Sequence, residues 1–591
     1  MKKYLFIALA ALGFAACAEK IDDNTPHNGE VENSYIAVSL SAADPATRAN
    51  DGTYQEGTAD ERAVETAYFF FFDKDGIAFP VTLSDGAANL PGGTHNYLQA
   101  TIDPTTGKDM PNVSDIKNVV LLLKSYKGTH PAQIVAVLNW VPAKATYSLE
   151  ELQSELTDVR SKVSGNLNGK FIMSNAVYAK EGTPATAVYA TPLTAENIFT
   201  DEVNAKANPV TIFVERAAAK VTVTTTGGKT VFDLNKPVTL GSSTTPVYAK
   251  IVGWELYNDY QQSYLVKNID PEWTNADLGF TWNDSPWYRC YWAISQTASF
   301  PENTFKYEYP MAADGHASVY GYGFGTAADV TAGTYAANTY TYCGENTDRD
   351  AADRTKIILK AQLQDNNEEP VELARWYTTE YLGEENLRTA VANTLKYTLY
   401  YKESENNYIG LKPSDLQCVS PEYNADGEII NGAPATIGSY EVFFQLTNDA
   451  AKKTWYRNVS GVMTQMTADA AEDPYGAKAT NAYLAEEVKP AILYKSGQTY
   501  YYIDIKHLGN GADSNDEGDY GIVRNHIYAI NINSIGGYGS PIYMGTSSII
   551  TPPEYPVDPD DEETSYVAAE VRILSWRLVS QSVDIEPTPG V

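Results

Sequence analysis

The sequence predicts a mainly all-β protein, built as two β-rich domains with long loops and a few short helices. Of its 591 residues, 43 are tyrosines, and tyrosine, valine and threonine in such numbers favour strands over helices. Short runs in which apolar and polar residues alternate recur along the chain, as expected for half-buried strands. The length indicates several domains, and 43% hydrophobic residues supply enough apolar surface for their cores. No short internal repeat is visible, so we expect neither a solenoid nor a propeller.

The first 17 residues have the pattern of a secretory leader. Residues 1–3 are Met-Lys-Lys, and the apolar run 4–12 follows. Two alanines then precede Cys17, which predicts a bacterial lipobox whose cysteine is diacylated and becomes the new N-terminus. The alternative is an ordinary signal peptide with an incidental cysteine. No other apolar run reaches the ~18 residues of a membrane-spanning helix, so we expect an exported protein that is at most lipid-anchored.

The first strand is expected at residues 34–40, after a polar tether at 18–33. Ile36, Val38 and Leu40 alternate along it and would share one face. We expect this strand to fill an edge of a sheet and part of an apolar groove.

Further strand signals follow from about residue 63. Residues 67–72 run into Asp73–Gly76, a hairpin-type turn in which the glycine supplies a positive φ. Residues 147–163 carry leucine and valine at helical spacing, which predicts the best helix of the first half. Other strands of this first domain are expected at 119–123, 133–140, 171–175 and 210–216.

A second domain begins near Ala217. Its strands are expected at 220–224, 250–256, 356–363, 500–505 and 525–532. Residues 270–350 and 405–490 show little periodicity and are interpreted as long loops. The segment 551–563 is rich in proline and acidic residues, so we expect an extended linker there.

The last segment, residues 566–585, is strand-forming but follows no partner strand in the sequence. Its apolar residues are Val567, Ala569, Val571 and Ile573 on one face, then Trp576 and Leu578 after a change of phase. About 19 residues at ~3.3 Å each span on the order of 60 Å, enough to reach along a neighbouring subunit. The alternative is that this tail folds back onto its own domain as the last strand.

Composition and motifs exclude several classes of function. The net charge is −32, with 75 acidic against 43 basic residues, whereas nucleic-acid binding needs basic stripes. The sequence contains no zinc-protease, Cys-x-x-Cys, phosphate-loop or nucleophile-elbow motif, and none of its six histidines has metal-ligand spacing to another. We therefore expect no enzyme activity, no cofactor, and no catalytic or metal-ligating residue.

Two weaker patterns have simpler explanations. Residues 513–519 resemble the front of a calcium loop, but Arg524 stands where a bidentate glutamate belongs, so a solvated acidic hairpin is favoured. Aromatic residues gather at 282–292, where a sugar-stacking platform is one interpretation and packing in a core or sheet the favoured one.

Besides Cys17 the chain has Cys290, Cys343 and Cys418. An odd number does not make a fully paired disulfide framework. One bridge and three buried thiols both remain open.

The two ends together indicate a protein that polymerises. Cleavage after Arg48 would separate the strand at 34–40 from the body, and the nearest lysine or arginine on either side is Lys20 or Arg62. Loss of that strand would leave unpaired N–H and C=O groups beside an apolar slot, a template for another strand. The tail of a second copy could fill the slot by β-augmentation. Because donor and acceptor are different surfaces, such a contact propagates head to tail.

Several local motifs resemble the major fimbrillin of the short fimbriae of the Bacteroidales, the type V pili. The motifs are Cys17 followed by a single arginine at Arg48; Phe171–Ser174; Ile212–Ala219; Val523–Ile532; the Pro/Asp linker; and a tail with Trp576 that ends in Val583–Glu586. The resemblance covers both ends and the join between the domains, whereas residues 230–490 match only loosely.

This resemblance implies two transthyretin-like β-sandwich domains and an extended C-terminal donor strand. It implies lipid on Cys17, cleavage of the Arg48–Ala49 bond, and donation of a strand from residues 566–585. The implied division is a leader (1–17), a tether with a removable strand (18–48), an N-terminal sandwich (49–216), a C-terminal sandwich (217–550), a linker (551–565) and the donor tail (566–591).

The expected function is therefore a shaft subunit of a cell-surface fimbria that polymerises by protease-triggered strand exchange and supports adhesion. We expect an outer-membrane lipoprotein precursor and a mature protein in the extracellular fimbria. Its expected partners are copies of itself, anchor and tip subunits, an arginine-specific surface protease, and host or bacterial surface ligands, but not nucleic acid. The alternatives are a monomeric surface lipoprotein that binds glycans or a host protein, and, on weak carboxylate patterns alone, a calcium-dependent surface hydrolase.

Overall fold

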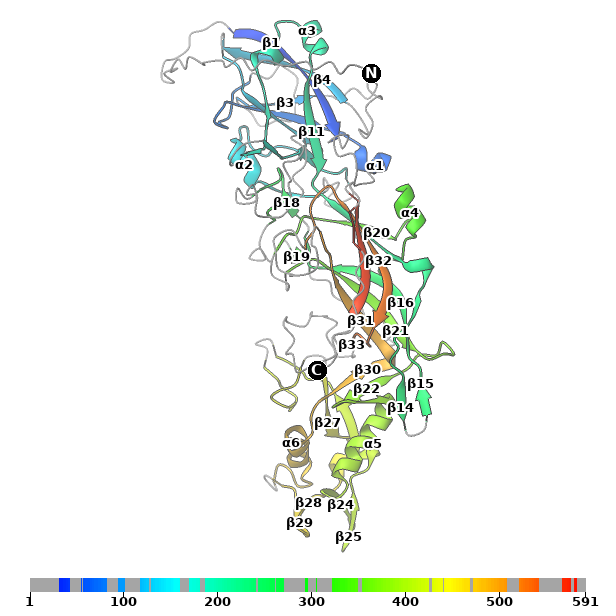
Figure 1. Cartoon of the computed structure of the whole chain (residues 1–591). Coiled ribbons are helices and arrows are strands. Elements are labelled where there is room, and N and C mark those ends of the chain that lie inside the picture. The colour runs from blue at the N-terminus through cyan, green and yellow to red at the C-terminus, as the bar shows by residue number, and fades with distance from the viewer. Residues whose placement is uncertain are drawn as a thin grey trace.

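The computed structural model consists mainly of strands, arranged in three units that follow one another along the molecule (Figure 1). The mainly all-β prediction is confirmed. The structure describes residues 31–42, 55, 57–81, 94–100, 117–126, 129–159, 169–180, 186–240, 243–260, 262–269, 293–295, 304–305, 321–348, 353–424, 428–438, 441–467, 471–507, 520–541, 566–574 and 579–581.

The N-terminal unit is built on one eight-stranded sheet. In spatial order its strands are β3 (Tyr97–Ala100), β2 (Ala67–Phe72), β5 (Gln133–Leu138), β7 (Met173–Asn175), β11 (Val210–Arg216), β1 (Val31–Ala42) and β4 (Lys117–Tyr126), with β10 (Thr191–Pro192) beside β5. The predicted hairpin turn follows β2, where Gly76 has a φ of 79°.

Both faces of this sheet are buried, because alternate residues of a strand point to opposite sides. Phe69 and Phe71 of β2 lie in one apolar core with residues of β1, β4 and β11. Phe70 and Phe72 lie in a second core together with Leu265 and Val266. The second core therefore joins the N-terminal unit to a segment that comes from the second unit.

The helix predicted at 147–163 is much shorter than its pattern suggested. The helix α2 covers only Leu149–Ser154, and its N-cap Ser148 forms a capping box with Glu151. The chain then turns into β6 (Leu156–Asp158), which pairs with β18 (Gln262–Tyr264). The prediction was wrong because a partner strand about a hundred residues away outweighs local helical spacing.

The second unit, here called the sandwich, has two five-stranded sheets that enclose one apolar core. The first sheet has the order β20 (Tyr340–Cys343), β12 (Ala219–Thr225), β32 (Ile527–Gly536), β34 (Tyr566–Leu574) and β35 (Val579–Gln581). The second has the order β13 (Val231–Asp233), β16 (Tyr248–Tyr257), β21 (Lys356–Gln364), β31 (Gln498–Asp504) and β33 (Ser540–Pro541).

A third unit, here called the inserted unit, lies between β21 and β31 in the sequence. One sheet has the order β23 (Thr379–Leu382), β22 (Leu373–Trp376), β30 (Ala491–Tyr494), β27 (Glu441–Leu446) and β26 (Leu416–Val419). The other has the order β25 (Asn407–Gly410), β24 (Leu399–Ser404), β28 (Trp455–Val459) and β29 (Val462–Gln465). With the helices α5 (Gly383–Leu395) and α6 (Ala477–Glu487) they enclose a core of their own.

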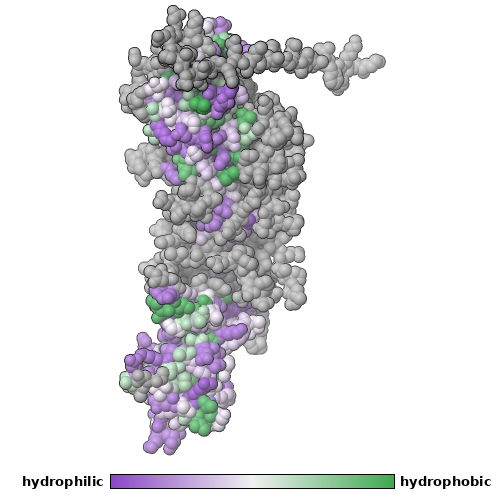
Figure 2. Space-filling model, turned by 90° about the vertical axis from the view of Figure 1, so that its left-hand side faces the viewer, coloured by the Kyte–Doolittle hydropathy of each residue, from purple (hydrophilic) through white to green (hydrophobic). Residues whose placement is uncertain are grey.

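The inserted unit corrects the interpretation of residues 405–490 as long loops. Its strands are short and several carry polar residues, so their alternation is weak. Figure 2 shows small groups of apolar residues on this unit, separated by hydrophilic ones. Exposed large apolar side chains of the unit include Tyr397, Val459 and Val462.

The remaining elements are small. They are β8 (Tyr178–Lys180) with β9 (Thr186–Val188), β14 (Val238–Leu240) with β15 (Ser243–Thr245), β17 (Asp259–Tyr260) with β19 (Thr304–Phe305), and the helices α1 (Ala59–Arg62), α3 (Glu202–Ala207) and α4 (Ala327–Ala332). Short 3-10 turns lie at 195–197, 226–228, 413–415, 450–452 and 495–497. None of the helices that the structure describes is long and apolar enough to cross a membrane.

Candidate functional site: the seat of the first strand and the joint

The first strand, β1, lies inside the sheet of the N-terminal unit. It pairs with β4 in antiparallel register from Val31 to Leu40 and with β11 in parallel register from Val38 to Ala42. The expectation that this strand fills an edge was wrong, because β4 pairs on its outer side. We call the space between β4 and β11 the slot.

The predicted apolar positions of β1 lie opposite buried residues of both neighbours. Ile36 is fully buried and is in register with Leu121 of β4. Val38 is in register with both Val119 and Val210, which belong to the same core. The third position, Leu40, is in register with Ile212, a fully buried residue of that core. The register of β1 therefore follows the alternation that the sequence predicts.

The predicted scissile bond lies outside the described residues, but its two flanks are described. On one side, Ala42 pairs with Val214 near the end of β11. On the other side, the Gln55 amide donates to the Val330 carbonyl and accepts from the Tyr335 hydroxyl at 2.8 Å. Residues 43–54, which include Arg48 and Ala49, lie between these two flanks in the sequence.

The tail lies on its own sandwich in this structure. The strand β34 pairs antiparallel with β32, and β35 folds back on β34. Val571 is in register with Ile530, and Ile573 with Tyr528, both fully buried. Val567 and Ala569 likewise stand opposite Ile535 and Ile532, whereas Trp576 and Leu578 lie outside the described residues. The sequence left open whether the tail folds back onto its own domain. In the single chain it does so.

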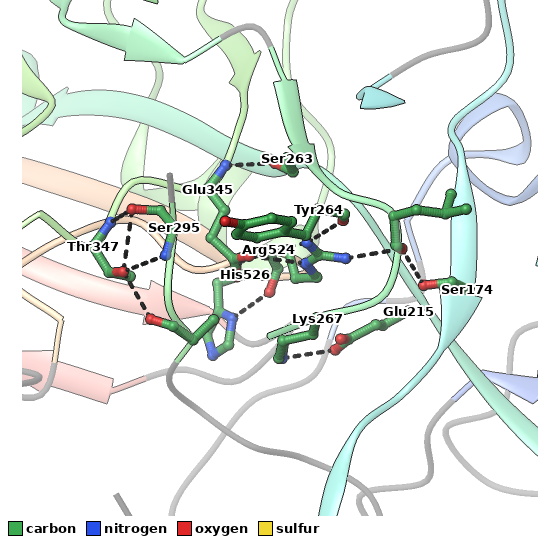
Figure 3. Close-up of polar contacts among 12 residues, drawn as sticks. Ser174, Glu215, Ser263, Tyr264, Lys267, Ser295, Glu345, Thr347, Arg524 and His526 are labelled. Carbon is green, nitrogen blue, oxygen red and sulfur yellow. Dashed lines mark hydrogen bonds and ion pairs between the residues drawn. The ribbon is translucent and has the colours of Figure 1, made fainter. Parts of the chain in front are cut away.

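The N-terminal unit and the sandwich meet at a joint that is held by buried charges (Figure 3). Arg524 donates to the Glu345 carboxylate from Nε at 3.1 Å and from Nη2 at 3.0 Å. Its Nη2 also donates to the Tyr264 carbonyl at 2.5 Å and its Nη1 to the Leu265 carbonyl at 3.3 Å. Arg524, which the calcium-loop pattern had placed at a ligand position, therefore serves as a structural cation.

A second buried ion pair lies beside the first. Lys267 donates to the Glu215 carboxylate at 2.9 Å, and both side chains are almost fully excluded from solvent. Burial raises the pKa of the Glu215 carboxyl, against the opposing charges of Lys267 and Arg524. Ser174 of β7 donates to the Leu265 carbonyl at 2.6 Å. Residues of β7 and β11 are in this way bound to the segment 262–269.

A third group of contacts centres on Glu61 of helix α1. Its carboxylate accepts from Lys220 Nζ at 3.0 Å and from the Tyr342 hydroxyl, and its carbonyl accepts from Arg216 Nε at 2.6 Å. The Lys220 ammonium also lies 3.9 Å from the ring centre of Tyr335. Burial would raise the pKa of Glu61, but the Lys220 charge and the hydrogen bonds outweigh it, so the pKa lies below its ordinary 4.5.

Sequence reasoning missed these joint residues as a group. Two of the quoted motifs contain them: Ile212–Ala219 holds Glu215 and Arg216, and Val523–Ile532 holds Arg524. Charged residues inside otherwise apolar strand motifs were the available signal, because buried charges need partners. The sequence could not say which partners these were.

Other predicted sites fall outside the described residues. They are Cys17, Cys290, the aromatic stretch 282–292 and the acidic stretch 513–519. In the part of the chain that the structure describes, Cys343 and Cys418 form no disulfide. Burial raises the pKa of the Cys418 thiol, so it is not a reactive thiolate at neutral pH.

The C-terminal part of the chain matches a known family. Residues 492–582 match the family described as "Major fimbrial subunit protein type IV, Fimbrillin, C-terminal". This part of the chain is similar to the C-terminal region of fimbrillins. The resemblance drawn from the sequence is thereby confirmed, and the matched range includes β31, β32, β34 and β35.

Solved structures of fimbrial proteins are also similar, and no curated protein matches. A fimbrilin (FimA) from Porphyromonas gingivalis W83 is 12% identical, with 85% of this chain and 92% of that chain covered and a TM-score of 0.30. A fimbrial assembly protein from Parabacteroides distasonis is 11% identical, with 72% and 100% covered and a TM-score of 0.26. The tip fimbrial protein Mfa3 from P. gingivalis is 10% identical, with 85% and 95% covered and a TM-score of 0.23. At TM-scores this low, the similarity supports no conclusion about this chain.

Fimbrillins are structural subunits of fimbriae on the outside of the cell. The match of residues 492–582 therefore supports a fimbrial subunit of the cell surface.

Proposed function

We propose that this protein is a shaft subunit of a cell-surface fimbria. It polymerises by strand exchange, and cleavage after Arg48 starts this exchange. The observation that carries the proposal is the two-sided pairing of β1 between β4 and β11. Residues 18–48, which include β1, would leave after the cut, and the tail of a second copy would enter the slot.

The position of β1 makes its loss unfavourable in free energy and its replacement by another strand favourable. Without β1, the backbone groups of both β4 and β11 lose partners, and unmade hydrogen bonds beside an apolar core are unfavourable. Among the described strands, β4 pairs with β1 alone. An incoming strand would thus restore two ladders and the attachment of β4.

The tail has alternating apolar residues that suit the slot. Its alternating residues Val567, Ala569, Val571 and Ile573 already stand opposite core residues of β32 in the single chain. There the tail has one partner strand from the body, β32, whereas the slot offers two. The exchange would therefore gain a second ladder, and Trp576 and Leu578 would extend the contact.

The proposal also covers the route to the surface and the partners. The precursor would carry lipid on Cys17 at the outer membrane, and an arginine-specific protease would cut the Arg48–Ala49 bond. Anchor and tip subunits would end the filament, and adhesion to host or bacterial ligands would use exposed surface such as that of the inserted unit. We propose the two-domain division at 216/217 with the inserted unit as part of the second domain.

The test is cleavage of recombinant residues 18–591 with an arginine-specific protease, followed by size analysis and electron microscopy. Filaments are expected from the wild type, but not from a chain lacking 566–591 and not from the Arg48→Gln variant. A clean cut at Arg48 that leaves only monomers would contradict strand exchange and favour the monomeric surface lipoprotein.

A further inference from the structure

Arg48 is not the only arginine near the new N-terminus. The next one is Arg62, in helix α1, and no lysine or arginine lies between them. A protease that recognises arginine alone would accept both, and a cut after Arg62 would remove residues 49–62. The structure contains a reason why the second bond would be spared.

The chain before the Arg62–Ala63 bond is held by Glu61. The buried Glu61 carboxylate takes hydrogen bonds from Lys220, from Tyr342 and, at 2.6 Å, from the Thr58 backbone N–H. Its carbonyl takes a hydrogen bond from Arg216. Both charged side chains of the Glu61–Lys220 pair are 2% exposed, so neither can exchange its partner for water without local opening.

The chain after the same bond is held by Asn139. Its amide nitrogen donates to the Ala63 carbonyl at 2.9 Å, and its amide oxygen accepts from the Glu65 N–H at 2.8 Å. Asn139 is itself buried, and its amide nitrogen also donates to the Phe171 carbonyl at 2.8 Å. The backbone on both sides of the Arg62–Ala63 bond is thus fastened to different parts of the fold.

We propose that Glu61 and Asn139 form a clamp that protects the Arg62–Ala63 bond from the protease and so fixes Ala49 as the mature N-terminus. A protease binds its substrate as an extended segment, so several residues on both sides of the bond must leave the fold before cleavage. The rate of cleavage then follows the population of the opened segment. Glu61 and Asn139 are specificity-determining residues for the maturation, and this role rests on the proposed cleavage after Arg48.

The test compares Glu61→Gln with Glu65→Gln, the same chemical change four residues further on. Glu65 is exposed and lies on the other side of the same bond. The folded chain of residues 18–591 is treated with an arginine-specific endoprotease, and the products are followed by intact mass and N-terminal sequencing. The wild type and Glu65→Gln are expected to give the Ala49 end, and an Ala63 end only much more slowly, while Arg48 is consumed. Glu61→Gln is expected to give an Ala63 end at least about tenfold faster than the wild type, because local opening becomes easier.

Two further variants keep the result interpretable. Lys220→Met removes the other half of the buried pair, and Arg62→Lys in the Glu61→Gln background should abolish the Ala63 end. Hydrogen exchange of residues 57–66 reports whether the segment has opened. An Ala63 end that forms in the wild type as fast as the Ala49 end would overturn the proposal. The proposal would also be overturned if hydrogen exchange showed residues 57–66 open while the Arg62–Ala63 bond stayed uncut. The same holds if neither Glu61→Gln nor Lys220→Met opened this segment.

This outcome is independent of filament formation. A chain cut only at Arg48 that stays monomeric would refute strand exchange and leave the clamp intact. A chain cut at both arginines that still forms filaments would refute the clamp alone.

Discussion

Arg524 and Glu345 form a two-point ion pair at the joint, with the guanidinium Nε and Nη2 3.1 and 3.0 Å from the same carboxylate oxygen. The Glu345 carboxylate also accepts from the Arg524 backbone N–H at 3.1 Å. Both side chains are excluded from solvent. Because Arg524 lies beside β32 and also holds the carbonyls of Tyr264 and Leu265, this pair fastens the sandwich to the segment that covers the N-terminal unit.

Removal of the arginine is expected to destabilise the whole chain. Arg524→Met leaves the Glu345 carboxylate buried without its cation, a loss of about 3–5 kcal/mol in the free energy of unfolding. Denaturant unfolding of the monomer measures it. The control is Lys452→Met, which removes the exposed pair with Asp449 and should cost about 0–1 kcal/mol. Equal losses in the two variants would show that the buried pair does not hold the joint.

The Glu61 contacts predict a pH dependence. The pKa of Glu61 lies below 4.5 in the folded chain, so its contribution to stability is fully present above the unfolded value. As the pH falls below 4.5 through the lower folded value, that contribution is lost. The difference in unfolding free energy between the wild type and Glu61→Gln should therefore shrink as the pH falls below about 4.5.

The measurement is unfolding by denaturant at several pH values, with Glu65→Gln as the control for the loss of one carboxylate. An exposed change of this kind should alter the unfolding free energy by about 0.5 kcal/mol or less. A wild-type advantage over Glu61→Gln that grows as the pH falls would contradict the direction assigned to the Glu61 pKa.

The strands were predictable where one face is apolar and the signal is local. The alternation at 34–40 and the run 67–72 appear as β1 and β2, and the turn at Gly76 as expected. The neighbours of β1 were not predictable, because β4 and β11 lie some 80 and 170 residues further along the chain. Pairing between such distant strands leaves no local mark on the sequence.

Errors in the sequence interpretation had two different causes. The end of helix α2 at Ser154 is set by the pairing of β6 with β18, which is tertiary. Helix α5 carried a local signal that was missed: its buried residues Leu387, Val391 and Leu395 have a spacing of four. The buried charges of the joint were visible as charged residues in apolar motifs, but their pairing depends on the fold.

Because β1 lies in the slot only until cleavage, we expect Ile36 to stabilise the precursor but not the mature protein. Ile36→Ala removes a fully buried side chain and should lower the unfolding free energy of residues 18–591 by about 2–5 kcal/mol. The control Ile77→Ala makes the same change at a side chain that is 62% exposed and should cost about 0.5 kcal/mol or less. After cleavage at Arg48 and loss of residues 18–48, the Ile36→Ala protein should be identical to the wild type. A penalty that persists in the mature protein would mean that β1 does not leave.

Head-to-tail exchange predicts two kinds of chain terminator. Val571→Asp places a charge at a position that stands opposite a core residue, so this variant should accept a tail but not donate one. Arg48→Gln keeps β1 in the slot, so this variant should donate a tail but not accept one. Each variant mixed with cut wild-type protein should shorten filaments in proportion to its mole fraction, because each ends growth at one end.

The matched controls are Arg572→Gln, a change at the neighbouring tail position, and the double variant Arg48→Gln with Val571→Asp. Arg572→Gln alone should still form filaments of wild-type length after the cut. The double variant can neither donate nor accept, so added to wild-type protein it should leave the length distribution unchanged, as measured by electron microscopy. If the double variant shortens filaments as strongly as the single variants, growth is blocked by some other contact. The slot and the tail are then not the two halves of the contact between subunits.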